Sequence, residues 1–375
     1  MKRIIAFCLF LLIFGSFVFA DDAKVMPMMV GRIYIAPTYG FALGEYDTDG
    51  NYHKYSKTVQ LFNLGFAIEY GVINWITAAV QWVPGWTPWS DVTGALDSTV
   101  DKAKLYGIPL NPDGNSNGVA DLFVGAKIQI VGEKAPVQTS MFRAAIAPGV
   151  LIPLPGANFD DAATKLLAGS SVTVKNMDRH VFGAGARLYF DWIVNDHFYL
   201  NLYNETLFFP VKKDLAKHGP ELAMMKGMLS MSPLGSSPMG GAISSLGGDV
   251  NYKYQTTFEI EPVFTTPLAE GFVFSAGLPI NYKYVPAPDY SLNSSFTMLD
   301  GLGANATTIF KGFLNTDPQH VLSLRPNVSL FITKLFLPLE FKFQYGLPVW
   351  GKNVPGSHTM TLQIRAYFAL PGRPE

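Results

Sequence analysis

The sequence predicts an all-β protein: a transmembrane, antiparallel, up-and-down β-barrel of about twelve strands. Three observations support this prediction: a secretion signal at the amino terminus, repeated segments with one apolar and one polar face, and an unusual composition. Charged residues make up only 15% of the chain and aromatic residues 14%, whereas charged residues reach about a quarter of average soluble domains. A barrel with an apolar outer face and Gly-rich loops would have this composition.

The first twenty residues, Met1 to Ala20, have the pattern of a cleaved signal peptide. Lys2 and Arg3 precede the apolar run Ile4–Phe14, which is too short to span a bilayer as a helix. The single cysteine, Cys8, lies in this run, so we expect a mature chain without cysteine. Residues 21–375 are expected to form one barrel domain in the bacterial outer membrane.

The closing strand, Thr359–Phe368, shows the alternation most clearly, because every second residue from Met360 onward is apolar. The same pattern predicts eleven earlier strands. In chain order they are Met28–Phe41, Val59–Tyr70, Trp75–Val83, Ala120–Val131, Met141–Ile152, Val181–Ile193, Phe198–Phe209, Tyr252–Phe264, Phe272–Tyr284, His320–Ile332 and Leu335–Tyr345.

The gaps between these strands alternate between short turns and long loops, as in bacterial outer-membrane barrels. Gly71–Asn74, Val194–His197 and Thr333–Lys334 are short turns, whereas Pro84–Gly118 and Pro210–Val250 are long. We expect the long loops to be extracellular and to include short helices. Fourteen strands would form if a loop segment joined the wall. The barrel-assembly machinery is expected to recognise the closing strand, which ends at Phe368.

Prolines interrupt several predicted strands, and proline cannot donate to a strand ladder. They fall at positions Pro37, Pro148, Pro262, Pro279, Pro326 and Pro338. They indicate either bulges and strand ends, or a gap in the wall through which an apolar ligand leaves sideways into lipid.

The inward faces of the strands carry charges of both signs, which predicts a lumen cross-linked by ion pairs and a narrow or gated passage. The alternative is a plugged lumen whose charges serve only stability. The predicted lumen residues are Arg32, Glu69, Asp121, Lys127, Arg143, Arg187, Asp191, Glu205, Lys253, Glu259, Glu261, Arg325, Glu340, Lys342 and Arg365.

The long loops are unusually apolar, and their flexible methionines suit a surface that accepts varied apolar ligands. The segment Pro220–Met231 could form a short helix. Alternatively, the loops fold inward and pack on each other. The residues predicted to meet a hydrophobic substrate are Trp82, Trp86, Trp89, Phe209, Leu222, Met224, Met225, Met228 and Met231.

Residues 113–121 resemble the first half of a calcium loop, with oxygen ligands at Asp113, Asn115, Asn117 and Asp121. Val124 occupies the position of the bidentate Glu, and Asn and Gly are also ordinary turn residues. The motifs of hydrolases, zinc proteases and phosphate loops do not occur in the sequence, so we expect no enzyme. The net charge of −1 excludes the basic surface that nucleic-acid binding requires.

The segment Gly118–Lys127, with Gly125 and Lys127 at the expected spacing, resembles a strand of the outer-membrane family named for the meta-pathway of phenol degradation. The hairpin Ile68–Trp75 is similar to the preceding hairpin of that family. The resemblance implies a channel-like barrel associated with apolar or aromatic compounds. A wider likeness is to FadL-type fatty-acid transporters, but only Asp21–Pro27 precede the first strand. That segment is too short for the hatch of those transporters, so we expect any plug to come from the loops.

We therefore expect an outer-membrane channel that admits hydrophobic small molecules, such as fatty acids or aromatic compounds, past apolar extracellular loops. Its partners would be membrane lipid and the substrate. Two alternatives stay open: a surface-exposed structural protein or adhesin that transports nothing, and a small general porin.

Overall fold

The computed structural model describes residues 22–96, 114–154, 172–175, 181–215, 240–303, 305–311 and 317–369, and positions 222, 225, 226, 229 and 230. The predicted signal peptide lies outside the described residues. Among the described residues, no helix has both the length and the apolar character needed to cross a membrane.

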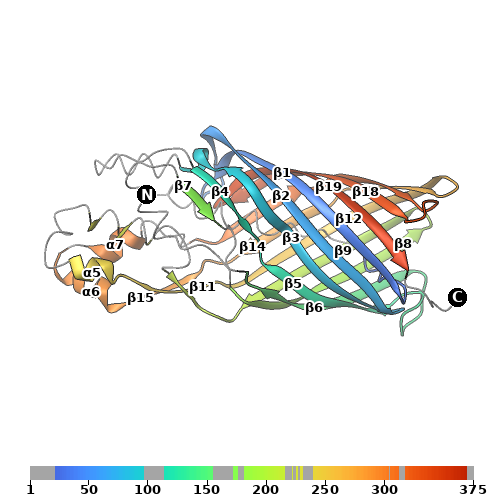
Figure 1. The fold of residues 1–375 in the computed structure, drawn as a ribbon, viewed down its shortest axis with the longest axis horizontal. Helices are drawn as coiled ribbons and strands as arrows, with labels where there is room; N and C mark the ends of the chain where they lie inside the picture. Colours follow the sequence, from blue (N-terminus) through green and yellow to red (C-terminus); the bar gives the residue numbers. More distant parts are fainter. Residues whose placement is uncertain are drawn as a thin grey trace.

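The molecule is a closed antiparallel barrel of twelve crossings, with a cap of loops and helices at one end (Figure 1). The wall runs in chain order, and the last strand pairs with the first. The uninterrupted crossings are β1 (Val30–Tyr46), β2 (Tyr52–Ile73), β3 (Ile76–Asp91), β5 (Leu122–Val131), β6 (Phe142–Ile152), β8 (Gly183–Asn195), β9 (Phe198–Phe209), β12 (Lys253–Ala269), β18 (Leu339–Lys352) and β19 (Val354–Ala369).

Two further crossings are each made of two shorter strands in line. One consists of β13 (Phe272–Gly277) and β14 (Ile280–Val285), and the other of β16 (Gln319–Leu324) and β17 (Asn327–Ile332). Both members of each pair bond to the same neighbours, so each pair fills one place in the wall. The prediction of twelve crossings is confirmed.

Side-chain alternation produces the two faces of the wall. On β1, Arg32 and Tyr34 point inward and are 4% and 6% exposed, whereas Ile33 is 46% exposed on the outside. Apolar and aromatic residues dominate the outer face of every crossing, as a wall surrounded by lipid requires. The polar inner face is buried because side chains from opposite walls fill the interior of a barrel of this size.

Several strands extend further than the alternation predicts. The first two form a hairpin that reaches Tyr46 and Tyr52, and the last two reach Lys352 and Val354. The extension of β2 is largely polar, whereas that of β18 carries the exposed apolar residues Leu347, Val349 and Trp350. In contrast, Leu335 was predicted to begin a strand but lies in the turn between β17 and β18, and Phe336 in that turn is fully exposed.

Both broken crossings are interrupted at prolines, and the breaks lie on neighbouring strands. The strands are paired on both sides of each interruption, and at each interruption a bond to a proline carbonyl joins the neighbouring strands: Leu278 N to Pro262 O (3.2 Å), Arg325 N to Pro279 O (2.8 Å) and Tyr345 N to Pro326 O (3.0 Å). A proline cannot return the reciprocal bond. We call this sector of β12, β14, β16 and β18 the proline seam.

The cap is built on the extracellular end from small elements. It contains β10 (Lys213–Asp214), β11 (Gly248–Asn251) and β15 (Asp289–Leu292), which form a separate sheet, and α5 (Gly240–Ser244), α6 (Ser294–Gly301) and α7 (Ala306–Lys311). Beside the mouth, η1 (Thr93–Leu96) follows β3, while β4 (Gly114–Val119) pairs with β3 and β7 (Val172–Lys175).

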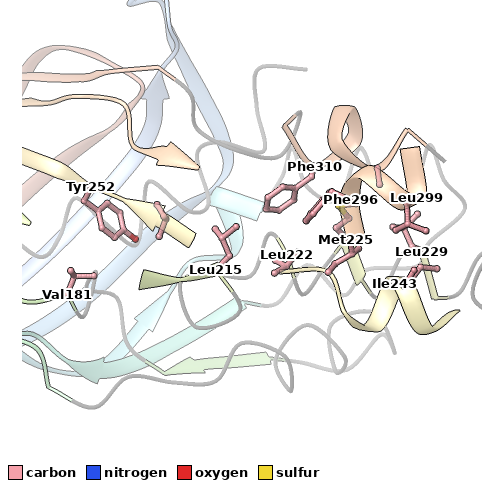
Figure 2. Close-up of a cluster of buried hydrophobic side chains, with 14 of the residues drawn as sticks. Val181, Leu215, Leu222, Met225, Leu229, Ile243, Tyr252, Phe296, Leu299 and Phe310 are labelled. Carbon is pink, nitrogen blue, oxygen red and sulfur yellow. The ribbon is translucent and has the colours of Figure 1, made fainter. Parts of the chain in front are cut away.

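One apolar core joins the cap to the barrel mouth. Figure 2 shows its side chains in a row, from Val181 and Tyr252 at the mouth through Leu215 and Leu222 to Met225 and the cap helices. Phe296, Leu299 and Phe310 from the helices are at most 1% exposed. We call this cluster the cap core.

Candidate functional site

Among the described residues, four ion pairs on the inner wall each join residues that face each other directly on neighbouring strands. They are Arg32 with Glu69, Arg143 with Asp191, Arg187 with Glu205, and Arg365 with Glu340. A residue directly opposite on an antiparallel pair is the nearest cross-strand neighbour. The inward charges named in these four pairs therefore lie opposite a charge of the other sign on the neighbouring strand.

These pairs are buried and share further polar partners. The Arg187 guanidinium lies 2.5 Å from Glu205, donates to Gln81, and covers the ring of Phe123 at 3.8 Å. Arg365 reaches Glu340 at 3.3 Å, and the Tyr367 hydroxyl donates to the same carboxylate at 2.7 Å. In each of these pairs a buried arginine neutralises a buried carboxylate, so the pairs leave little net charge of one sign on the inner wall.

A second polar cluster lines the inner side of the proline seam. The amide of Asn281 donates to Glu259 at 2.8 Å, and the amide of Asn327 donates to Glu261 at 2.9 Å. Arg325 lies at the break itself and its Nε is 3.3 Å from the Ser323 hydroxyl. Both carboxylates are buried, at 3% and 5% exposure. The interior of the seam is thus polar, while its lipid side is apolar.

The lumen also holds the chain segment that precedes β1, which corrects the expectation that any plug comes from the loops. The Ala23 N–H donates to both oxygens of Asp191 (3.2 and 3.1 Å), and the Met26 N–H donates to the Thr77 hydroxyl at 2.7 Å. Ala23 is fully buried. A few residues are enough to occupy part of the lumen because they follow the inner wall in an extended form. We call residues 22–28 the amino-terminal segment.

Residues of the two sequence motifs contact this segment. The Lys127 ammonium donates to the carbonyls of Asp22 (2.9 Å) and Lys24 (3.4 Å) and lies 4.1 Å from the Tyr189 ring centre. Gly71 lets the segment approach, because a Cβ there would lie 2.0 Å from the carbonyl oxygen of Pro27. Sequence reasoning selected both positions without finding the partner they share, since the segment itself carries no repeating pattern.

A polar space remains beside the amino-terminal segment. About 570 Å³, some of it continuous with solvent, is lined by residues that include Tyr34, Glu69, Gln81, Lys127, Arg187 and Arg365. Residues of the amino-terminal segment and of three ion pairs border this space.

The remaining predicted lumen residues lie elsewhere. Asp121 stands at the start of β5, where its carboxylate accepts the Leu154 N–H at 3.2 Å. Lys253 lies at the extracellular end of β12 and pairs with the exposed Asp289 at 2.9 Å. Lys342 follows Glu340 on the inward side of β18 and is half-buried. These three therefore do not join the four ion pairs.

The residues predicted to meet a substrate divide into three groups. Leu222, Met225 and Phe209 are buried in the cap core, so a ligand would reach them only if the cap opened. Trp86 and Trp89 are each 46% exposed on the extension of β3, and Trp82 stacks on Phe66 on the outer wall. Met224, Met228 and Met231 lie outside the described residues.

The calcium-like stretch does not form an ion-binding loop over its described part. Gly114–Val119 is the extended strand β4, so Asn115 and Asn117 lie along a ladder instead of wrapping around a central point. Asp113 lies outside the described residues. Among the residues that the structure describes, no cluster of three or more acidic, His or Cys side chains is arranged for a metal.

Outside the membrane-spanning part, one carboxylate organises the cap helices. Hydrogen bonds from the Thr307 hydroxyl and from the Thr307 N–H, the latter 3.0 Å long, hold the pKa of Asp300 below its usual value. The bond ties the end of α6 to the start of α7.

Comparison with a solved structure supports the fold. An outer-membrane channel from Pseudomonas putida F1 superposes with a TM-score of 0.57 at 10% identity, over 94% of this chain and all of the other. The NanC porin (TM-score 0.36, 8% identity, 90% of this chain and all of the other) and the CymD monoaromatic hydrocarbon channel (0.33, 11%, 92% and 89%) match too loosely to carry a conclusion.

No family model matches the chain, and no curated protein matches it by sequence. Neither the phenol-degradation family nor the FadL type is therefore shown. The fold and the apolar outer wall identify an outer-membrane β-barrel.

Proposed function

We propose that this barrel is an outer-membrane channel for hydrophobic small molecules, which enter at the cap and leave through the wall at the proline seam. The function is passive passage, and it requires no catalysis. The observation that carries the proposal is the alignment of three interruptions on neighbouring strand pairs, at each of which a bond to a proline carbonyl stands in place of the regular ladder.

The lumen supports a sideways route. A substrate travelling the whole length of the barrel would have to pass the ion pairs and displace the amino-terminal segment, which is anchored to Asp191, Thr77 and Lys127. An apolar molecule gains nothing from these polar surroundings, because it cannot replace their hydrogen bonds. Leaving through the wall into lipid returns it to an apolar medium.

The cap supports access by an apolar molecule. Among the described residues, the cap core forms one apolar cluster that runs from the helices to Phe209 and Tyr252 at the mouth. A molecule that entered this core would replace one set of apolar contacts by another. The route would follow the row of side chains in Figure 2 to Tyr252, which directly precedes β12.

A reversible cross-link across the seam tests the route. In the cysteine-free mature protein, Ile280→Cys with Leu324→Cys joins β14 to β16, since these residues face each other. The control pair, Val124→Cys with Val150→Cys, joins β5 to β6 in the same way on intact wall. Proteoliposomes would be assayed for uptake of a fluorescent fatty acid before and after reduction.

We expect the oxidised seam pair to block uptake, reduction to restore it, and the control pair to have no effect. Equal uptake by both oxidised variants would exclude the seam as the exit. Uptake no greater than that of protein-free liposomes would exclude the channel and favour a surface protein, for which the projecting cap would supply the binding surface.

A further inference from the structure

Three polar side chains lie in one row on the outer face of the wall. Tyr284 on β14, His320 on β16 and Lys352 on β18 face each other directly across neighbouring strands. They point outward, because alternation places the buried residues Lys283 and Gln319, 8% and 5% exposed, on the lumen side. Since β14 leads directly into the cap strand β15 (Figure 1), the row lies at the extracellular rim of the wall.

Aromatic rings surround this row and hold its side chains. The Tyr282 hydroxyl lies 2.7 Å from Nδ1 of His320, and the ring centres of Tyr284 and Trp350 lie 5.0 and 6.1 Å from that of His320. The Lys352 ammonium lies 6.0 Å from the centre of the Trp350 ring. Tyrosine and tryptophan are enriched where a membrane protein meets the lipid headgroups. The row is therefore at headgroup level.

The donors of this row lack acceptors within the part of the chain that the structure describes. There, the Lys352 ammonium and the Tyr284 hydroxyl have no hydrogen-bond or ion-pair partner, and His320 is bonded only through Nδ1. When the Tyr282 hydroxyl donates to Nδ1, the neutral imidazole carries its hydrogen on Nε2, and the protonated imidazole carries one there too. Tyr284, His320 and Lys352, which we call the donor row, thus present one cation and two further donors.

We propose that the donor row binds the phosphate group of an anionic lipid in the surrounding leaflet. Phosphate oxygens accept strong hydrogen bonds from an ammonium group, and a lysine at the membrane surface attracts anionic lipid. One step further into the wall on the same strands lie Leu322 and Trp350, directly opposite each other, and they offer the acyl chains an apolar surface. A lipid combines both chemistries in one molecule, whereas free phosphate would use only the donor row.

Competition in mixed micelles tests the ligand. A fluorescent phosphatidic acid reports binding to the refolded barrel, and dioleoylphosphatidic acid, dioleoylglycerol and inorganic phosphate are the competitors. We expect saturable binding that only dioleoylphosphatidic acid reverses, because dioleoylglycerol lacks the phosphate and inorganic phosphate lacks the acyl chains. Binding that does not saturate, or equal displacement by dioleoylglycerol, would overturn the proposal. Equal displacement by inorganic phosphate would overturn the assignment to lipid and indicate a site for a free anion.

A double variant tests the position of the site. His320→Phe/Lys352→Gln removes the cation and the ring donor and keeps an aromatic ring on β16, so we expect the affinity for phosphatidic acid to fall at least about 10-fold. Lys352→Gln alone, which leaves every ring in place, should lose part of this affinity. Lys54→Gln is the matched control, because it removes the same charge from an exposed residue at the extracellular end of β2.

The folding of each variant is checked by the slower migration of unfolded barrel on gels. An affinity that is unchanged in both Lys352 variants would overturn the proposal. So would an equal loss in Lys54→Gln, since net charge at the rim would then account for the binding.

Discussion

The ion pair of Arg187 and Glu205 allows a prediction of how much one buried pair of the lumen contributes to stability. Their charges are buried beside each other, with Glu205 at 2% exposure. Replacing one partner leaves an uncompensated charge in a low-dielectric interior, whereas replacing both by apolar residues removes the charges together. The two experiments therefore have different expected outcomes.

We predict that Glu205→Gln lowers the free energy of unfolding by roughly 3–5 kcal/mol, while Arg187→Met combined with Glu205→Leu costs much less. Urea unfolding of the refolded barrel, followed by tryptophan fluorescence, measures both. The exposed pair of Lys334 and Glu270, 3.1 Å apart at the opposite rim, supplies the control, because removing an exposed pair changes stability little. Equal losses in the single and double variants would contradict this account.

At the residue scale, the sequence contained more information about the lumen than a list of charges. Arg32 and Glu69 each follow the alternation of their strands, and the short turn Gly71–Asn74 fixes which strands are neighbours. Pairing of opposite charges at equal height could have been derived from this register. The outward positions of Asn204 and Thr206 could also have been found, since these polar residues interrupt the otherwise apolar outer face of β9.

The amino-terminal segment is the element whose position could not be derived from the sequence. Residues 22–28 have neither alternation nor a turn signal, and their contacts are made mostly by backbone groups that every residue carries. Only two residues that contact the segment, Gly71 and Lys127, lie in motifs that the sequence displays. The strands, in contrast, depend on side-chain alternation, which the sequence displays directly.

We predict that deleting residues 22–26 from the mature chain raises single-channel conductance several-fold, because the deletion removes the backbone that crosses the lumen beside Lys127 and Arg143. Planar-bilayer recording of the refolded protein measures the change. Lys127→Met, which removes the donor to Asp22 and Lys24, should give intermediate or fluctuating conductance. Conductance that stays at the wild-type level in the deletion would show that another part of the chain closes the passage.

The connection between the cap helices gives a prediction about pH. Hydrogen bonds from Thr307 depress the pKa of Asp300 in the folded cap. A depressed carboxyl pKa adds stability above the unfolded value, near 3.9, and this stability is lost as the pH falls through the folded value. Asp300→Ala should therefore increase amide exchange in residues 294–311 at pH 7.

The difference between wild type and Asp300→Ala should begin to shrink as the pH falls below about 4 and should disappear once the pH lies below the depressed pKa of Asp300, because both proteins then lack the charged acceptor. Hydrogen exchange followed by mass spectrometry, corrected for intrinsic rates, measures it. Asp289→Ala is the matched control, since Asp289 is exposed and pairs with Lys253. A wild-type advantage that persists unchanged at pH 3 would assign the stabilisation to side-chain shape instead of charge.

At the scale of the whole molecule, the axial route and the lateral route depend on different parts of the structure. The amino-terminal segment and the ion pairs obstruct the axial route, which ions and polar solutes would use. The proline seam interrupts the wall on the lateral route, which an apolar molecule would use. The prolines alone could not decide between bulges and a gap, because each is compatible with either. Their alignment on neighbouring strands is a property of the closed barrel.

If the routes are separate, a variant that alters one route should leave transport along the other route unchanged. Deletion of residues 22–26 should raise conductance and leave uptake of a fluorescent fatty acid nearly unchanged, since that molecule does not pass the ion pairs. The oxidised Ile280→Cys/Leu324→Cys barrel should lose fatty-acid uptake and keep its conductance, because the joined strands lie in the wall. Measuring both quantities on both variants gives four results. A seam cross-link that lowered conductance as strongly as uptake would mean that one passage serves both kinds of solute, and the lateral route would have to be abandoned.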